Sequence, residues 1–243
     1  MLRIIVNGAN GRMGQEVVKA VEQTTDLSLV ATTGSQDDLA TAIQTTKADI
    51  VVDFTRPDCV FQNTKTIIEQ GAHPVIGTTG LTQQQIVELQ QLAKTKQRGG
   101  VIAPNFSIGA ILMMQFAEQA AHYLPHVEII EMHHDKKLDA PSGTALKTAH
   151  MIAANRDQLP TMPTCKESIV GARGGNYENI AIHSIRLPGF LAHQMVIFGA
   201  EGESLTIKHD TISRSCFMPG VIMACRKVTA LHELVYGLEY LMD

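Results

Sequence analysis

The stretch that decides the fold is the N-terminal run Leu2-Arg3-Ile4-Ile5-Val6-Asn7-Gly8-Ala9-Asn10-Gly11-Arg12-Met13-Gly14. Its apolar start predicts a buried strand, and its three evenly spaced glycines predict a tight turn that opens a helix. In such a turn the first glycine permits the bend, the second lets the backbone approach a pyrophosphate, and the third lets the helix pack closely on the strand. The helix start offers amide groups and a positive dipole end to phosphates. This stretch therefore predicts a dinucleotide-binding site.

The first hundred residues alternate between strand-like and helix-like segments. Thr82 and Gln85 form a capping-box pattern, so we expect a helix that starts there and ends at Gly99-Gly100. A second helix, over 58–70, should end at Gly71 in the same way. Short runs rich in valine and isoleucine predict further parallel strands at 27–32, 49–54, 74–76 and 101–103. The alternation predicts a Rossmann-type, doubly wound parallel sheet.

After residue 105 the pattern changes. Helical periodicity covers 108–124 and 144–154, and strand patterns cover 127–132, 181–186, 194–200 and 203–210. These segments predict a smaller α+β domain with an open mixed sheet, and the polar, glycine-rich segment 155–180 predicts a loop. We expect a dinucleotide-binding domain at 1–104 and a substrate-binding and oligomerisation domain at 105–215. A C-terminal helix within 216–243 should pack back on the first domain.

Composition narrows the class of protein. Hydrophobic residues make up 44% of the 243-residue chain and charged residues 18%, as in ordinary globular proteins, and the formal net charge is −4. That charge argues against a nucleic-acid coat or a polybasic membrane patch. The four cysteines form no C-x-x-C pair, which favours free thiols in a reducing compartment over disulfides or a zinc site. We expect a cytoplasmic protein that binds neither nucleic acid nor membrane.

The end of the second predicted strand bears on the choice of cofactor. An acidic residue there would bind the ribose 2′-hydroxyl of NADH and repel the 2′-phosphate of NADPH. This chain has Gly34-Ser35-Gln36 at that point and no acid before Asp37, while Arg12 could reach a 2′-phosphate or lie in solvent. The sequence favours tolerance of NADPH and leaves NADH open.

The densest chemistry lies in Glu131-Met132-His133-His134-Asp135-Lys136-Lys137-Leu138-Asp139-Ala140-Pro141-Ser142-Gly143-Thr144-Ala145. Two histidines follow a predicted strand, and Pro-Ser-Gly-Thr leads into a helix whose N-terminus could bind a carboxylate. On their own, the histidines could be a solvated or core pair, and Lys137 an ordinary surface lysine. Adjacent side chains that leave a strand point to opposite faces, so the histidine pair is a poor metal chelate, and we expect no metal.

Five motifs in order resemble the 4-hydroxy-tetrahydrodipicolinate reductase (dihydrodipicolinate reductase) family over essentially the whole chain. They are Gly8 to Gly14, Asp53-Phe54-Thr55-Arg56-Pro57, Gly77-Thr78-Thr79-Gly80, Ala103-Pro104-Asn105-Phe106-Ser107, and the block from His133 to Thr144. The chain departs from the family member best known to us at Gly34-Ser35, where that protein has an acid and an arginine. Another dehydrogenase of this fold and a non-catalytic dinucleotide sensor are the alternatives, and the block from His133 argues against both.

The resemblance implies NADPH- or NADH-dependent reduction of a small cyclic dicarboxylate in diaminopimelate and lysine biosynthesis, by a homotetramer. By the same resemblance, the proton donors are His133 and Lys137, and the substrate is bound by His134, Gly143 and Thr144. The residues implied for the cofactor are Gly8, Ala9, Asn10, Gly11, Arg12, Met13, Gly77, Thr78, Thr79, Ala103, Pro104, Asn105 and Phe106. Histidine suits proton transfer because its ordinary pKa lies near neutral pH.

Overall fold

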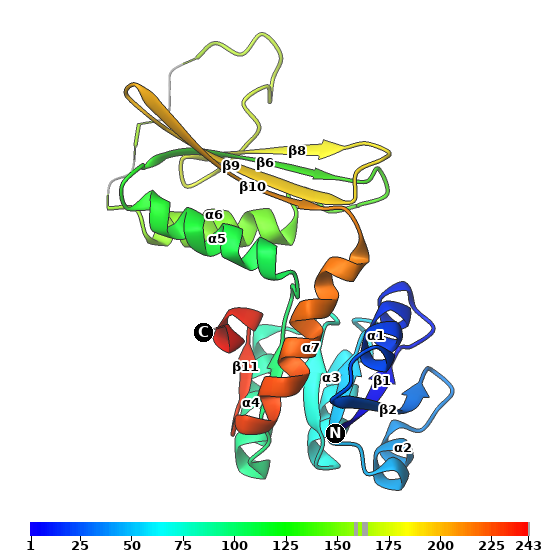
Figure 1. The fold of residues 1–243 in the computed structure, drawn as a ribbon. Helices are drawn as coiled ribbons and strands as arrows, with labels where there is room; N and C mark the ends of the chain where they lie inside the picture. Colours follow the sequence, from blue (N-terminus) through cyan, green and yellow to red (C-terminus); the bar gives the residue numbers. More distant parts are fainter. Residues whose placement is uncertain (158–159, 162–164, 243) are drawn as a thin grey trace. The chain divides into compact units, whose positions relative to one another are not determined.

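The structure, a computed structural model, describes residues 1–157, 160–161 and 165–242. It divides the chain into two compact units, which we call unit 1 (Met1–Ile108 with Arg214–Asp243) and unit 2 (Gly109–Ser213). Each unit has its own sheet (Figure 1). None of the helices in the described part of the chain has both the length and the apolar character that a membrane crossing requires.

Unit 1 is a six-stranded sheet in which every strand pair is parallel, with the order β11-β5-β4-β3-β1-β2. Its strands are β1 (Leu2–Asn7), β2 (Leu27–Thr33), β3 (Ile50–Asp53), β4 (His73–Ile76), β5 (Gly100–Ile102) and β11 (Leu234–Tyr236). Its helices are α1 (Arg12–Glu22), α2 (Leu39–Thr46), α3 (Val60–Glu69), α4 (Gln83–Lys96) and α7 (Met218–Lys227). This arrangement confirms the predicted Rossmann-type sheet.

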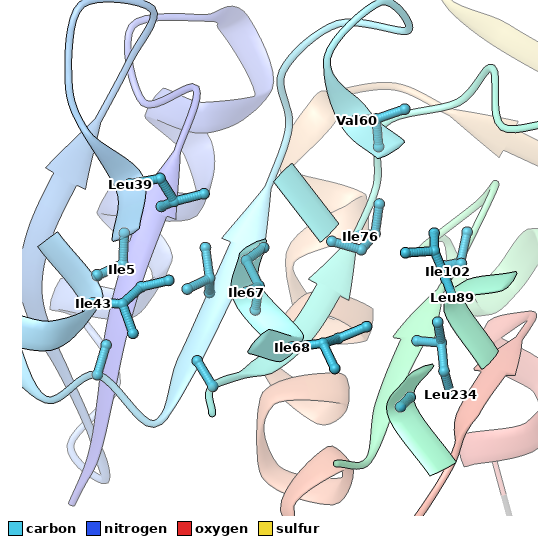
Figure 2. Packing of buried hydrophobic residues seen from close by; sticks show 14 of the residues in the cluster. Ile5, Leu39, Ile43, Val60, Ile67, Ile68, Ile76, Leu89, Ile102 and Leu234 are labelled. Carbon is cyan, nitrogen blue, oxygen red and sulfur yellow. The ribbon is translucent and has the colours of Figure 1, made fainter. Parts of the chain in front are cut away.

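The core of unit 1 explains why apolar runs rather than alternating patterns form these strands. Helices cover both faces of the sheet, so Ile4, Ile5 and Val6 are all fully buried although neighbours point to opposite faces. Figure 2 shows one side of this core, where Ile67 and Ile68 of α3 lie between side chains of the strands. The continuous burial of β1 holds the glycine turn at a fixed place at the carboxyl edge of the sheet.

In unit 1, the helix predicted to begin at Thr82 ends earlier than expected. Helix α4 begins with the predicted capping box of Thr82 and Gln85, but it ends at Lys96 with Gln97 in the left-handed conformation, before Gly99-Gly100. A Cβ on Gly99 would lie 2.3 Å from the Val228 carbonyl oxygen, so this glycine permits close packing on the C-terminal segment.

The C-terminal helix predicted within 216–243 is wrong beyond Lys227. The chain forms a 3₁₀ turn at Arg214–Phe217, then α7, a second turn at Val228–Ala230, and strand β11, before a last turn at Leu238–Leu241. The apolar residues of this tail fit a helical period, but Leu234 pairs with Gly100 and completes the edge of the sheet. A three-residue strand is too short for its pattern to be distinguished from a helix by periodicity.

Unit 2 is a five-stranded mixed sheet with the order β10-β9-β6-β8-β7, in which β6 and β8 pair in parallel and the other described strand pairs are antiparallel. Its strands are β6 (His126–His133), β7 (Gly175–Tyr177), β8 (Ile180–Arg186), β9 (Ala192–Ala200) and β10 (Glu203–Thr211). Helices α5 (Ile108–Ala121) and α6 (Gly143–Ala154) lie along one face of this sheet (Figure 1). The predicted open mixed sheet is confirmed. Within the predicted loop 155–180, residues 158–159 and 162–164 lie outside the described residues.

Candidate active site

The glycine turn of unit 1 depends on close backbone approaches. Gly8 has φ +84°, and a Cβ there would lie 2.4 Å from the carbonyl oxygen of Phe54. A Cβ on Gly14 would lie 2.1 Å from the carbonyl oxygen of Gly8, so the third glycine fits the helix against the turn itself, where the sequence predicted packing on the strand. Gly11 is the N-cap of α1 and provides no side-chain cap. The first amides of α1 are therefore left for a ligand.

A pocket of about 370 Å³ opens at this turn. It brings together six of the predicted cofactor residues, from two separate motifs: Gly11, Arg12, Met13, Gly77, Thr78 and Thr79. Phe54, Thr55, Pro57 and Arg214 complete its lining. Two guanidinium-bearing side chains and a helix N-terminus without acidic residues in its first turn favour an anionic ligand, so the residues present fit a dinucleotide pyrophosphate.

Beneath the pocket, a buried carboxylate joins the ends of three strands. Asp53, at the end of β3, is fully buried and accepts hydrogen bonds from Asn7 Nδ2 at 2.8 Å, Thr78 Oγ1 at 2.6 Å and Asn63 Nδ2 at 3.0 Å. The backbone N–H and Oγ1 of Thr55 also donate to it, at 3.1 and 2.8 Å. These hydrogen bonds satisfy the buried carboxyl oxygens. Asp53 thus fixes Thr55 and Thr78, which line the pocket.

The motif from Ala103 to Phe106, which the resemblance implies for the cofactor, directly follows strand β5. Ala103 and Phe106 are almost fully buried, and the Phe106 ring packs on Phe54 with centroids 5.7 Å apart. The Asn105 Oδ1 accepts the Ser107 N–H at 2.8 Å. Pro104 lines a smaller pocket of about 40 Å³ together with Thr78, Thr79, Gly80, Leu81, Ile102 and Tyr236.

The end of β2 carries an exposed carboxylate. The Oδ2 of Asp37 accepts the backbone N–H of Gly34 at 2.8 Å, so the acid that follows the strand by four residues folds back to its tip. In a Rossmann-type sheet, this tip faces the ribose that carries the 2′ position. Arg12, at the start of α1, lines the pocket at the glycine turn.

In unit 2, the predicted proton donor belongs to a chain of three charged or titratable side chains. His133 is the last residue of β6, and its Nδ1 lies 2.5 Å from Oε2 of Glu131. Arg186, at the end of β8, donates to both oxygens of Glu131 at 2.7 and 2.9 Å. Burial raises the pKa of Glu131, but the hydrogen bonds from His133 and Arg186 outweigh it and lower that pKa from 4.5 to about 2. Glu131 therefore remains ionised at neutral pH.

The same carboxylate holds the start of α6. The backbone N–H of Ser142 donates to Glu131 Oε1 at 3.2 Å, and Ser142 Oγ accepts the Ala145 N–H at 3.2 Å as the N-cap. Gly143 and Thr144 form the first turn, where amides have no acceptor inside the helix. Their position beside the capped helix start suits a carboxylate ligand.

Hydrogen bonds of Lys137 hold the loop between His133 and α6. The Lys137 N–H donates to the His134 carbonyl at 3.1 Å, and Lys137 Nζ binds both oxygens of Asp139 at 2.7 and 2.8 Å. This ion pair lowers the pKa of Asp139. Arg186 also donates to the Asp139 carbonyl at 2.7 Å, so the loop is held to the strand that positions Glu131.

Four residues that shape the two candidate sites were given no role from the sequence: Asp53, Glu131, Arg186 and Arg214. Glu131 alone had a usable signal, because residues two apart on a strand share a face and it precedes His133 by two. The other three depend on partners far along the chain. Among the described residues, no group of three or more His, Cys, Asp or Glu side chains is arranged to hold a metal ion, and all four cysteines are free.

The comparisons with known proteins cover both units. A family model described as dihydrodipicolinate reductase, N-terminus, matches residues 2–106, and one described as dihydrodipicolinate reductase, C-terminus, matches residues 109–242. The curated 4-hydroxy-tetrahydrodipicolinate reductase of Coxiella burnetii (strain RSA 493 / Nine Mile phase I) is 56% identical over 241 residues, with 99% of each chain covered. That of Legionella pneumophila (strain Lens) is 57% identical over 240 residues, again with 99% of each covered.

A solved structure agrees with these matches. The dipicolinate-bound dihydrodipicolinate reductase from Paenisporosarcina sp. TG-14 is 44% identical, with a TM-score of 0.91 and 99% of each chain covered. The similarity in sequence and in fold covers both units, and the relatives have nearly the same length as this chain. The chain belongs to the dihydrodipicolinate reductase family.

Proposed function

We propose that this protein reduces 4-hydroxy-tetrahydrodipicolinate to tetrahydrodipicolinate, with loss of water, in diaminopimelate and lysine biosynthesis, and that it uses NADPH or NADH. The observation that carries the proposal is the arrangement of His133 and the α6 N-terminus around one ionised carboxylate, Glu131. A proton donor and an anion-binding helix start lie on the same short segment. The names of the relatives and the pocket at the glycine turn of unit 1 support the same reaction.

The residues of unit 1 bind and orient the cofactor. The turn from Gly8 to Met13 presents amides and Arg12 to the pyrophosphate, with Arg214 as a second cation. Gly77, Thr78 and Thr79, with the backbone from Ala103 to Phe106, would hold the nicotinamide end at the carboxyl edge of β4 and β5. When bound, the reduced dinucleotide supplies a hydride.

The residues of unit 2 bind the substrate and supply the proton. Loss of the 4-hydroxyl as water leaves a conjugated imine, and hydride addition at C4 moves electron density towards C3 and the nitrogen. His133 is placed to deliver the proton that this density requires, and Lys137 adds positive charge that stabilises it. His134, Gly143 and Thr144 would bind the carboxylates at the helix start.

The test follows NAD(P)H oxidation at 340 nm with enzymatically generated substrate. We expect substrate-dependent oxidation, and a loss of about 10²–10⁴-fold in kcat for His133→Ala and Lys137→Ala. His134→Ala and Thr144→Ala should instead raise KM, because carboxylates are present in both ground and transition states. Fluorescence titration of NADPH is the control, since none of these residues lies in unit 1. Near-normal kcat in both His133→Ala and Lys137→Ala would reject the roles, and absence of oxidation by the unaltered protein would reject the reaction.

The outer face of the unit 2 sheet supports a homotetramer. Helices α5 and α6 cover one face, whereas Ile130, Met132, Ile185, Met195 and Ile197 lie on the other, half-buried within the single chain. Apolar side chains on a sheet face over which no helix of the described residues packs favour association with further copies. A reducing, cytoplasmic location would keep the four cysteines as thiols, and we propose that location as well.

A further inference from the structure

The contact between Glu131 and His133 fixes one nitrogen of the His133 ring. Glu131 and His133 are two residues apart on β6, so their side chains share the face that α5 and α6 cover. The carboxylate is fully buried, while the side chain of His133 keeps 14% of its surface exposed. The ring is therefore held at Nδ1 by a buried partner.

The state of the carboxylate decides the direction of that hydrogen bond. Two hydrogen bonds from the Arg186 guanidinium and one from the Ser142 amide keep Glu131 ionised. An ionised carboxylate has no hydrogen to give, so the Nδ1 of His133 must be the donor. The neutral ring then carries its proton on Nδ1 and has a free lone pair at Nε2.

We propose that Glu131, kept ionised by Arg186, is a positioning residue that fixes the Nδ1–H tautomer of His133, so that Nε2 is the only ring atom that exchanges a proton with the substrate. The inference rests on the proposed function for its catalytic consequence but not for the tautomer itself. When His133 is protonated, the carboxylate also stabilises the imidazolium. When Nε2 has given up its proton, the ring returns to the one tautomer that can be protonated there again.

The chain contains a matched control on the opposite face of the same strand. Glu128 of β6 accepts from His183 Nε2 at 2.9 Å and also pairs with Arg173, so it forms a second Glu–His–Arg group. Glu128 and His183 lie outside the residues assigned to substrate, cofactor or proton transfer. Glu128→Gln removes the same charge from the same strand and should leave His133 unaffected.

Glu131→Gln tests the role of the charge while retaining the shape. A glutamine amide can donate to Nδ1, which would move the ring proton to Nε2 and leave no basic atom towards the substrate. By analogy with the loss of the orienting acid in hydrolase triads, kcat should fall by about 10²–10⁴-fold. KM and the NADPH dissociation constant should change by less than about threefold, because the backbone amides of Gly143 and Thr144 are not altered. Glu128→Gln should match the unaltered protein in all three.

The tautomer is measured separately, on substrate-free protein labelled with ¹⁵N-histidine, with the His133 ring assigned by its absence in His133→Gln. At a pH where the ring is neutral, two-bond ¹⁵N–¹H spectra should show a protonated Nδ1 and an unprotonated Nε2 in the unaltered protein. Glu131→Gln should shift the ring towards Nε2–H. An Nε2–H ring in the unaltered protein would overturn the proposal, even if Glu131→Gln failed to fold. So would a kcat within threefold in Glu131→Gln. Absence of reductase activity would reject the proposed function but leave the tautomer result standing.

Discussion

At the scale of single residues, Asp37 is the side chain placed to influence the choice between cofactors. Its carboxylate lies at the tip of β2, on the Gly34 amide. We expect both NADPH and NADH to support reduction. Asp37→Asn keeps the hydrogen bond to Gly34 but removes a negative charge near the 2′-phosphate, a repulsion of about 1 kcal/mol at a solvated site. The ratio of kcat/KM for NADPH to that for NADH should therefore rise by about fivefold.

Steady-state kinetics with each cofactor at saturating substrate measure that ratio. Glu22→Gln is the control, because it removes one exposed negative charge at the other end of α1. An unchanged ratio in Asp37→Asn would show that this carboxylate does not contact the 2′ position, and an equal rise in both variants would point to net charge alone.

The same scale shows what residue patterns can and cannot predict. The block from His133 to Thr144 was recognisable because its chemistry is contiguous in sequence. The partners of Glu131, the carboxylate two residues before that block, were not recognisable, since Arg186 lies 55 residues after it. Asp53 was quoted within a motif without a role, because its donors come from elsewhere in the chain: Asn7 ends β1, and Thr78 lies in the loop after β4. Buried hydrogen-bond networks are tertiary features, and sequence periodicity carries no information about which distant donors meet.

At the scale of elements, Gly14 sets how α1 sits on the glycine turn. Gly14→Ala would place a Cβ 2.1 Å from the Gly8 carbonyl oxygen and 2.7 Å from the Ala9 Cα, both backbone atoms that cannot rotate away. The turn must shift, at a cost of about 1–3 kcal/mol in the free energy of unfolding. NADPH affinity should fall at least tenfold, because the amides of α1 move with the turn. Isothermal titration measures the affinity, with Gly199→Ala as the control because a Cβ there meets no atom within 4 Å.

The tie between β6, β8 and the start of α6 should make unit 2 sensitive to acid. The pKa of Glu131 is lowered from 4.5 to about 2, so its contribution to stability is complete above pH 4.5 and is lost as the pH falls towards 2. That contribution is on the order of 3 kcal/mol. Hydrogen exchange of β6 and β8 amides, corrected for its intrinsic pH dependence, should show protection that declines across this window. In Glu131→Gln the decline should be smaller, and equal declines in both proteins would contradict the assignment.

Elements also show where sequence patterns are weakest. The long apolar runs of β1 and β3 and the capping box of α4 were predicted because their signals are local and several residues long. β11 was missed because a strand of three residues is too short to show a hydrophobic period. Its pairing with β5 is what makes it a strand. Tertiary pairing decides such short segments.

At the scale of the whole molecule, the face of the unit 2 sheet opposite α5 and α6 should determine the oligomeric state. Ile197→Asp places a charge among Ile130, Met132 and Met195 and should dissociate the proposed tetramer, because burying an unpaired carboxylate costs several kcal/mol. Sedimentation velocity at micromolar concentration should then show smaller species than for the unaltered protein. Val87→Asp, at an exposed position on α4, is the control. A tetramer that persists in Ile197→Asp, or a monomer in the unaltered protein, would reject this interface.

The last strand of unit 1 has a consequence for how the chain is made. β11 completes the edge of a sheet whose first strand is β1, and Arg226 of α7 binds Asp26 through two hydrogen bonds of 2.8 Å. A ribosome adding about 5–20 residues per second must therefore translate all of unit 2 before the edge of β5 can be covered, a delay of roughly ten seconds. Unit 2 is one uninterrupted stretch and can fold during that time. The dinucleotide-binding unit, although it emerges first, therefore keeps an open sheet edge until β11 has been made.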